Sequence, residues 1–309
     1  MQYVNEPSRI ERDEPSVVAL GSFDGVHRGH QKLFKLAKEE SQRLNIETIV
    51  FSFYPHPTWI VGNSKKSLIM SQEEKRNIIE SIGIDILIEY PFTKDFADML
   101  PEDFFANILV NKLHTKVLVV GSNYYFGKGK QGGVELLKEL GEKYNVKVVI
   151  VDAVLEGDEI ISSSRIRKLI SSGNIEMANK LAGHPYSVSG TIVKGNQLGR
   201  KLGFPTINIM TEEYRAYPPN GVYATKVYID KKQYLGITNI GYAPTVDVEV
   251  KRIETYIYDF NEDVYGKHAK VEFYKFIRPE RKFNSIDELK SEVDKNKQQV
   301  TEYFSSNYQ

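Results

Sequence analysis

Residues 21–30 read GSFDGVHRGH, and they come directly after a short apolar run at 17–20. An amphipathic stretch at 31–44 follows, so the order predicts a strand, a glycine-containing turn and a helix N-terminus. Backbone N–H groups without helical partners and the positive end of the helix dipole both favour an anion at such a place. We therefore expect residues 21–30 to bind phosphate.

Two histidines in this stretch, His27 and His30, are three residues apart. That spacing puts both imidazoles on neighbouring parts of the first helical turn, where they can face the same anion. Gly29 between them leaves room for a phosphate close to the backbone. The alternative is a polar surface turn with two exposed histidines, and the position directly after a strand favours the phosphate interpretation.

The composition is that of an ordinary globular protein with room for two domains. The chain has 309 residues, of which 41% are apolar and 27% charged, and its formal net charge is zero. We therefore expect no nucleic-acid partner, and no apolar run reaches the length of a membrane span. The chain has no cysteine, which excludes disulfides, thiolate zinc sites and cysteine nucleophiles. With no signal-peptide pattern at the start, these points predict a cytoplasmic protein without a membrane partner, and self-association cannot be read from them.

The first 180 residues alternate between apolar runs and amphipathic stretches, which predicts an α/β domain with a mainly parallel, Rossmann-like sheet. A capping-box pattern, Ser71 with Glu74, marks one helix start. Ligands in such sheets bind beyond the carboxyl ends of the strands. The expected strands are 17–20, 47–53, 84–89, 116–120 and 147–151, and the expected helices are 31–44, 71–81, 101–113 and 134–144.

After Gly183 the expected strands become short and rich in β-branched residues and tyrosine, with turn residues between them, which predicts an antiparallel barrel or sandwich. A last helix is expected from Ser285 to about Phe304. The predicted domains are therefore 1–183 and 184–309. The expected strands of the second domain are 186–193, 222–229, 234–240, 252–259 and 269–277.

Three further segments of the first domain fall at the expected ends of strands or the start of a helix. They read FSFYPHP at 51–57, GSNYYFG at 121–127 and ISSSRIR at 161–167. Hydroxyls at a helix N-terminus can cap the helix or donate to phosphate, and Arg165 adds positive charge. The first two segments place aromatic residues beside glycine or proline, as a wall for a flat ring requires, although such a segment taken alone is more often the edge of a core.

The second domain carries GTIVKG at 190–195 and LGRKLGFPTIN at 198–208. The glycines and basic residues of this region make a loop that can close over phosphates. In an extended segment, residues 206 and 208 point to the same face. A hydroxyl from Thr206 beside the amide oxygen of Asn208 suits Mg²⁺, a hard cation that keeps waters and uses few protein ligands.

These motifs together resemble a known family. The stretch at 21–30 and the segments at 51–57, 121–127 and 161–167 resemble the nucleotidyltransferase superfamily. More narrowly, they resemble the N-terminal half of the bacterial bifunctional riboflavin kinase/FMN adenylyltransferases, the FAD synthetases. The PTIN segment, NIGYAPT at 239–245 and ETYIYDF at 254–260 resemble the riboflavin kinase half. The resemblance implies phosphorylation of riboflavin to FMN in the C-terminal domain and adenylylation of FMN to FAD, with release of pyrophosphate, in the N-terminal domain.

For the first domain the resemblance implies that His27 and His30 hold the ATP phosphates and stabilise charge on the α-phosphate. Ser164 and Arg165 would hold the triphosphate from the other side. Asn123 would help bind the substrates, and Phe53 and Phe126 would contact the isoalloxazine ring. The expected ATP-binding residues of this domain are Gly21, Phe23, His27, Gly29, His30, Ser164 and Arg165.

For the second domain the resemblance implies that Glu254 is the general base on the ribityl 5′-hydroxyl, while γ-phosphoryl transfer from ATP proceeds in line. Thr206 and Asn208 would bind Mg²⁺. Gly195 and Lys201 would contact ATP, and Arg281 would contact flavin or phosphate. The expected cofactor is thus Mg²⁺, with ATP, riboflavin and FMN as the small-molecule substrates and FAD as the final product.

The sequence departs from the family pattern at a few positions, and none of them removes the assigned base or metal ligands. Many relatives carry an acidic residue where Asn123 stands and Phe where Tyr124 stands, and an acidic residue is frequent at the position of Tyr54. In the second domain the pattern has His in place of Tyr256 and often Arg in place of Ala243.

Three other interpretations compete with the bifunctional one. In the first, only one half is active and the other binds ligand or supports an oligomer, and the departures at Tyr54, Tyr124, Ala243 and Tyr256 are its only support. A flavin-binding regulatory protein has no need of a metal pair beside a base. A nucleotidyltransferase for a different acceptor would leave the second set of motifs unexplained.

Overall fold

The computed structural model describes residues 1–62, 65–195, 204–243 and 250–307 and forms two compact units. The first unit comprises residues 1–67 and 71–163, and the second comprises 68–70 and 164–309. The boundary at 163/164 differs from the predicted division at 183/184, which falls between the last helix before the barrel and its first strand.

The first unit is built on a six-stranded sheet in the order β1-β4-β3-β2-β5-β6, and every pairing between its strands is parallel. The five predicted strands are confirmed, and β1 adds an edge strand that the sequence pattern had not indicated. The strands are β1 (Gln2–Val4), β2 (Ser16–Leu20), β3 (Glu47–Tyr54), β4 (Ile86–Pro91), β5 (Thr115–Gly121) and β6 (Lys147–Val151). The predicted α/β class is therefore confirmed.

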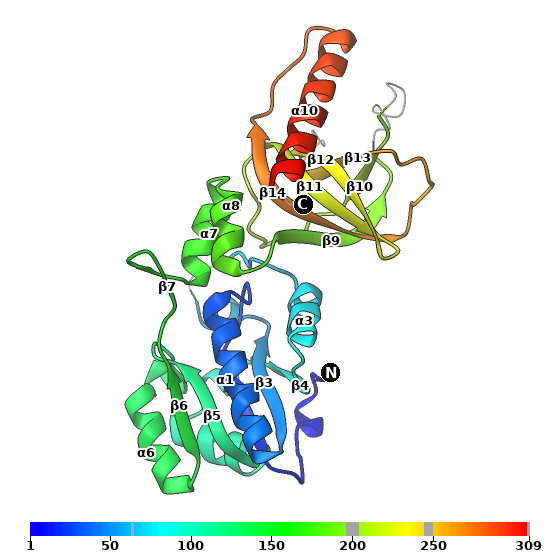
Figure 1. Ribbon diagram of the computed structural model, residues 1–309. Helices are drawn as coiled ribbons and strands as arrows, with labels where there is room; N and C mark the ends of the chain where they lie inside the picture. Colours follow the sequence, from blue (N-terminus) through cyan, green and yellow to red (C-terminus); the bar gives the residue numbers. More distant parts are fainter. Residues whose placement is uncertain (63–64, 196–203, 244–249, 308–309) are drawn as a thin grey trace. The chain divides into compact units, whose positions relative to one another are not determined.

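The longest helix of the first unit, α1 (Arg28–Leu44), lies against the sheet (Figure 1) and begins three residues before the predicted start, with His27 as its N-cap. The capping box predicted at Ser71 and Glu74 is present at the start of α3 (Gln72–Ser81). The other elements are η1 (Pro7–Arg9), α2 (Pro57–Val61), α4 (Lys94–Ala97), η3 (Lys128–Lys130), α6 (Val134–Tyr144) and the hairpin of β7 (Leu155–Glu156) and β8 (Glu159–Ile160).

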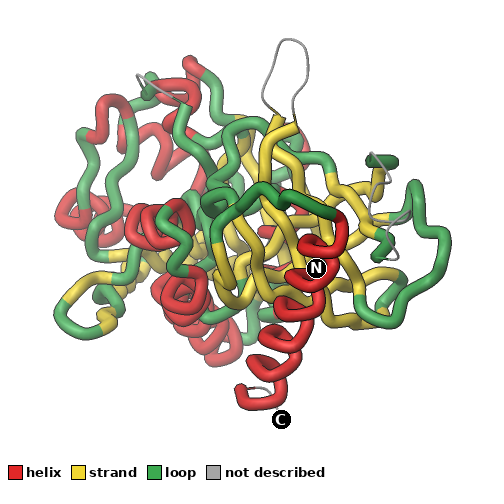
Figure 2. The backbone as a smooth tube through the Cα atoms, turned by 90° about the horizontal axis from the view of Figure 1, so that it is seen from above, coloured by secondary structure: helices red, strands yellow, loops and turns green. Residues whose placement is uncertain are grey.

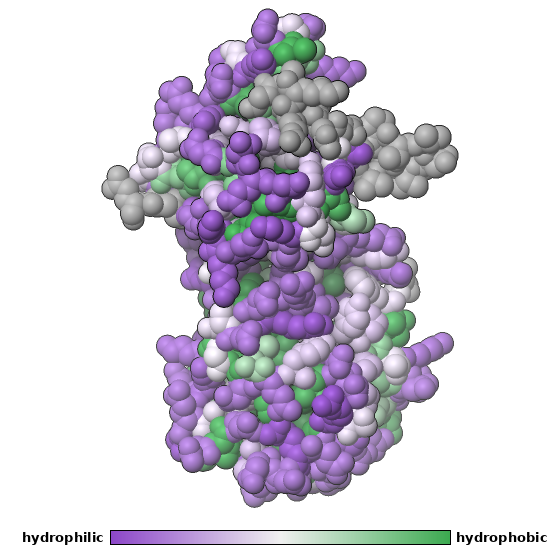
Figure 3. All heavy atoms as spheres, turned by 90° about the vertical axis from the view of Figure 1, so that its right-hand side faces the viewer, coloured by the Kyte–Doolittle hydropathy of each residue, from purple (hydrophilic) through white to green (hydrophobic). Residues whose placement is uncertain are grey.

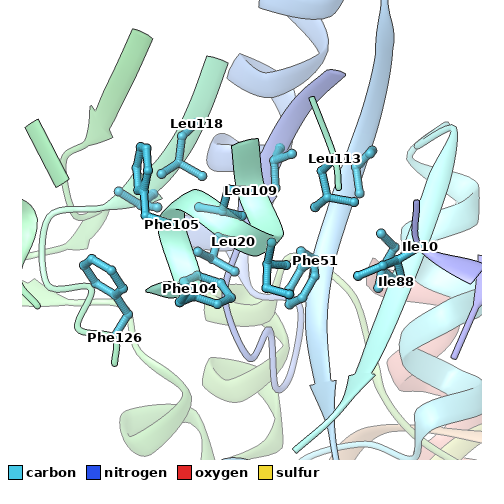
Figure 4. Close-up of a cluster of buried hydrophobic side chains, with 14 of the residues drawn as sticks. Ile10, Leu20, Phe51, Ile88, Phe104, Phe105, Leu109, Leu113, Leu118 and Phe126 are labelled. Atoms are coloured by element: carbon cyan, nitrogen blue, oxygen red, sulfur yellow. The ribbon is translucent and has the colours of Figure 1, made fainter. Parts of the chain in front are cut away.

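The helix predicted at 101–113 takes a different form. One α-helical turn, α5 (Pro101–Asp103), continues into a π-helix, η2 (Phe104–Val110). Figure 4 shows Phe104, Phe105 and Leu109 of η2 packed among side chains of the strands, and these three are buried in one hydrophobic cluster. This cluster fixes the sheet whose carboxyl ends carry the motifs described above. Its labelled members are Ile10, Leu20, Phe51, Ile88, Phe104, Phe105, Leu109, Leu113, Leu118 and Phe126.

The second unit contains a closed antiparallel barrel of six strands in the order β10-β13-β12-β11-β14-β9, which decides between the predicted barrel and sandwich. Residues 68–70 join this unit because the backbone of Leu68 pairs with that of residues 214 and 216. The strands are β9 (Tyr186–Val193), β10 (Thr206–Ile209), β11 (Gly221–Ile229), β12 (Lys232–Ala243), β13 (Val250–Ile257) and β14 (His268–Arg278).

Three helices complete the second unit: α7 (Ser163–Ser171), α8 (Ile175–Ala182) and α10 (Ile286–Asn307). The side chain of Asn179 on α8 donates to the carbonyl of Phe273 at 2.8 Å and accepts from the N–H of Tyr186 at 2.7 Å, which ties α8 to the barrel. The predicted terminal helix is confirmed as α10, which lies along the barrel strands (Figure 2) and buries Val300 and Phe304 against them.

Charged and polar side chains cover most of the face shown in Figure 3, and the hydrophobic areas between them are small. Within the described part of the chain, we find no helix with a length and apolar character sufficient to cross a bilayer.

Replacing Ser71 with alanine removes the hydroxyl that accepts from the N–H of Glu74 at the start of α3. We expect Ser71→Ala to lower the free energy of unfolding of the first unit by about 1 kcal/mol. Trp59 is the single tryptophan of the chain and lies in this unit, so its fluorescence during urea unfolding reports the change. Ser81→Ala is the matched control, since Ser81 is exposed and bonds only a carbonyl of its own helix. An equal loss in both variants would contradict the role of the cap.

Candidate active sites

The loop between β2 and α1 has an unusual backbone. Phe23, Gly25 and Val26 all have positive φ angles, of 52°, 81° and 32°. A positive φ is rare for a residue other than glycine and especially so for a β-branched residue such as Val26. The surrounding structure must therefore hold residues 21–27 in this conformation.

Three side chains from outside the loop each hold one of its alternate carbonyl groups. The donors come from β3, from Ser163 at the end of the first unit and from α1, so that separate parts of this unit converge on the loop. They are Ser52 Oγ to Ser22 O at 3.1 Å, Ser163 Oγ to Asp24 O at 2.8 Å, and Gln31 Nε2 to Val26 O at 2.8 Å. With alternate carbonyls held in this way, the loop has a fixed shape before any ligand binds.

The two imidazoles predicted to act together are in contact. The rings of His27 and His30 are stacked, with centroids 3.6 Å apart and planes 20° from parallel. The fully buried ring of Phe23 meets His30 edge-on at 5.2 Å. The site therefore presents a rigid pair of imidazoles at the N-terminus of α1.

Burial lowers the pKa of His30 well below its usual value, and the neighbouring His27 acts in the same direction. The Nδ1 atom of His30 is buried and makes no hydrogen bond within the protein. His30 is therefore a neutral imidazole at pH 7 in the absence of ligand.

Both glycines assigned to this site lie close to an aromatic ring. A side chain at Gly29 would place its Cβ 3.1 Å from the ring of His27, and one at Gly21 would lie 2.8 Å from the ring of Phe23. Gly29 thus makes room for the histidine itself, a role that the sequence pattern alone does not reveal.

The other residues assigned to the first site lie in different environments. Phe53 on β3 and Phe126 are both buried in the hydrophobic cluster, whereas Asn123 is exposed directly after β5. Ser164 and Arg165 occupy the first turn of α7, which Ser163 begins. Their predicted contacts with flavin and ATP stay predictions.

In the second unit, one rung of the barrel brings three polar side chains side by side. Asn208 on β10 pairs with Glu254 on β13, and Glu254 pairs with Asn239 on β12. Directly paired residues of antiparallel strands point to the same face, so these side chains share one face of the barrel. Thr206, two residues before Asn208, donates its hydroxyl to Glu254 Oε1 at 2.5 Å.

This face opens into a cavity of about 250 Å³. The predicted base Glu254, the predicted metal ligand Thr206 and the predicted substrate contact Arg281 all line it, together with residues of α10. Arg281 pairs with Glu292 of α10 at 2.9 Å and lies over the ring of Phe283. Gly195 packs against Asn208, because a Cβ at this position would overlap the Asn208 amide. Lys201 lies outside the described residues.

Two polar residues that line the cavity, Asn239 and Glu280, had no role assigned from the sequence. Asn239 donates to Glu280 at 3.2 Å, and Asn220 donates to the other oxygen of the same carboxylate at 3.1 Å. Glu280 therefore adds a second carboxylate to the cavity that holds Glu254. A charged residue in the turn after the last strand gives no sequence signal for this position.

The oxygen donors of this face suit a hard cation. In the Thr206–Glu254 bond the carboxylate accepts, so the hydroxyl oxygen of Thr206 keeps lone pairs for a metal. Asn208 is buried on the same face. Among the described residues, this face included, no group of three or more histidine, aspartate or glutamate side chains is arranged to hold a metal ion.

Comparison with known proteins agrees with the two sites. The FAD synthetase family model matches residues 9–165, and the riboflavin kinase model matches residues 182–304. The bifunctional riboflavin kinase/FMN adenylyltransferase of Bacillus subtilis is 38% identical over 98% of both chains. The chain belongs to this family.

Other relatives support the same conclusion. The Escherichia coli K12 protein of the same description is 34% identical over 94% of this chain and 93% of its own. A crystal structure from Streptococcus pneumoniae, described as a macrolide-efflux protein, superposes with a TM-score of 0.88 at 31% identity and covers 99% of both chains. The family resemblance and the fold predicted from the sequence are confirmed.

Adding a methyl group at Gly29 tests the packing of the His27 ring. We expect Gly29→Ala to lower the rate of FAD formation from FMN at least tenfold, because a displaced His27 loses its stacking with His30. In the matched control Gly133→Ala, the new methyl group meets Tyr125 at an ordinary distance of 3.6 Å. A steady-state assay of FAD formation compares the two variants, and an unaffected Gly29→Ala would rule out this packing constraint.

The lowered pKa of His30 predicts a pH dependence of stability. The unfolded chain takes up a proton near pH 6.5, whereas folded His30 stays neutral to lower pH. His30 therefore has no effect above this range, and it destabilises the fold as the pH falls from about 6.5 toward its lowered pKa. His30→Gln should reduce the pH dependence by up to about 1.4 kcal/mol per pH unit. Urea unfolding between pH 7.5 and 5.5, followed by Trp59 fluorescence, measures it, and identical slopes would refute it.

Proposed function

We propose that the loop at 21–27 and the first turn of α1 bind ATP for the transfer of an adenylyl group to FMN. The phosphate of FMN is already an anion, so it attacks the α-phosphorus directly and pyrophosphate leaves, without a protein nucleophile. Positioning and stabilisation of the transition-state charge then supply most of the rate enhancement. The observation that supports this proposal is the stacked pair His27–His30 on a loop held by three external donors.

The remaining assignments of this first site follow the family pattern. Ser164 and Arg165 hold the triphosphate through hydroxyl and guanidinium donors at the start of α7. Asn123 contacts the substrates from the end of β5. Phe53 and Phe126 provide the aromatic surface for the isoalloxazine ring.

In the second unit, Glu254 accepts the proton of the ribityl 5′-hydroxyl of riboflavin, and the hydroxyl oxygen attacks the γ-phosphorus of ATP, giving FMN and ADP. The supporting observation is the position of Glu254 in the cavity, in contact with Thr206 and level with Asn208. Gly195 and Lys201 contact ATP, and Arg281 contacts flavin or phosphate from the cavity wall.

Thr206 and Asn208 would hold Mg²⁺ through their hydroxyl and amide oxygens. Bound there, the ion neutralises phosphate charge. The substrates riboflavin and ATP and the absence of cysteine fit an enzyme of the cytoplasm that acts on small molecules and not on nucleic acid or membranes.

His27 and His30 lie in the first unit and Glu254 lies in the second. The two reactions should therefore be separable by mutation. Glu254→Gln should abolish FMN formation from riboflavin and leave FAD formation from added FMN unchanged. His30→Ala should have the opposite effect. Each variant is the control for the other, and an unchanged kinase rate in Glu254→Gln would show that the base is assigned wrongly.

A time course with riboflavin, ATP and Mg²⁺ tests the whole sequence of reactions. Chromatographic separation should show FMN appearing first and FAD accumulating later at its expense. Replacement of Mg²⁺ by EDTA should stop both reactions. FMN without FAD would refute the adenylyl-transfer assignment, and no turnover with tight flavin binding would refute both.

A further inference from the structure

A buried charged cluster in the first unit takes no part in the chemistry described above. The ammonium group of Lys75 on α3 lies 2.9 Å from Glu89 on β4 and donates to Ser52 Oγ on β3 at 3.1 Å. Lys75 is 3% exposed, Glu89 1% and Ser52 not at all. Ser52 is also the residue that holds the carbonyl of Ser22 in the phosphate-binding loop.

The direction of each hydrogen bond in this cluster is fixed by chemistry. An ammonium group only donates, so Ser52 Oγ must accept from Lys75. A serine hydroxyl has a single hydrogen, and that hydrogen is then available for the carbonyl of Ser22, 3.1 Å away. The chain of donors therefore runs in one direction, from Lys75 through Ser52 to Ser22.

This chain of donors ends where the loop is most constrained. Ser22 comes directly before Phe23, which has a φ of 52° and packs against His30. The N–H of Gly21 donates to the carbonyl of Phe51 at 3.1 Å, so two bonds to neighbouring residues of β3 anchor the start of the loop. A change at Ser52 would therefore reach the histidine pair through Phe23.

Stability alone does not account for Lys75. Burial lowers the pKa of its ammonium group, and Glu89 has to offset this cost. Apolar residues of similar volume often replace buried ion pairs without loss of stability. Glu89 would also keep two donors without Lys75, because Arg76 and Tyr3 each donate to its Oε2 at 3.0 Å. Lys75 alone supplies the contacts with Glu89 Oε1 and with Ser52, and only the contact with Ser52 leads on to the loop.

We propose that Lys75 and Ser52 are positioning residues for FAD formation. The buried ammonium directs the Ser52 hydroxyl to the Ser22 carbonyl and thereby holds residues 21–27 in the shape that receives the triphosphate of ATP. The inference rests on the proposed assignment of this loop to ATP.

Two variants of equal shape test the Ser52 hydroxyl. Ser52→Thr and Ser52→Val add the same bulk, and only the threonine keeps a hydroxyl. We expect the kcat/KM for ATP in FAD formation to be about tenfold lower in Ser52→Val than in Ser52→Thr, with the KM for FMN similar in both. Equal values for ATP would overturn the proposal. Urea unfolding followed by Trp59 fluorescence, which reports on the first unit, controls for the fold of each variant, and Ser52→Ala repeats the test without added bulk.

Lys75→Met and Arg76→Met separate the contact with Ser52 from the pairing of Glu89. Both remove a cation from Glu89, but only Lys75 touches Ser52. The kcat/KM for ATP should fall about tenfold in Lys75→Met and stay within about twofold of wild type in Arg76→Met. Equal losses would overturn the proposal. His30→Ala tests the assignment of the loop to ATP independently of Lys75 and Ser52, because unchanged FAD formation in this variant would refute that assignment.

Discussion

The backbone of residues 21–27 is held in a conformation that its own sequence disfavours, and the first active site depends on this constraint. Positive φ angles at Phe23 and Val26 cost about 1–3 kcal/mol each. The compensation comes from outside the loop. Ser52 and Ser163 reach its carbonyls from positions 30 and 139 residues away in the sequence, and the ring of Phe23 is fully buried. The histidine pair is therefore in place only when the sheet has formed around the loop, so the site and the fold of this unit are one cooperative structure.

Sequence reasoning succeeded where a local pattern determines the structure. Uninterrupted apolar runs predicted the buried parallel strands, and Ser71 with Glu74 predicted the start of α3 because a capping box involves only neighbouring residues. It failed where the outcome depends on tertiary contacts. The strand β1 has three residues and one buried side chain, too few for a periodic signal. The segment FFANILV has the same apolar content for an α-helix as for a π-helix, and only packing against the sheet decides between them.

The sites show the same division between local and tertiary information. Alternation along an extended segment placed Thr206 and Asn208 on one face before any pairing was known. The pairing itself, with Glu254 opposite Asn208 and Asn239 opposite Glu254, depends on strand register, which one sequence does not reveal. Lys75 is the clearest case, since a lysine in an amphipathic helix is expected in solvent. Its burial follows from the position of Glu89 on a neighbouring strand.

The two proposed sites would meet the negative charge of ATP in different ways, and the difference has a physical consequence. The barrel face offers oxygen ligands and a carboxylate, so a nucleotide bound there as proposed would need an accompanying cation. The loop offers backbone N–H groups and an imidazole that burial keeps neutral in the absence of ligand. A triphosphate beside His30 opposes that effect, because a nearby negative charge favours the imidazolium form. The positive charge at the first site would then arise together with the nucleotide. On the proposed assignment, an empty site avoids burying an unpaired cation, and a bound triphosphate would favour a cation next to the phosphorus that FMN attacks.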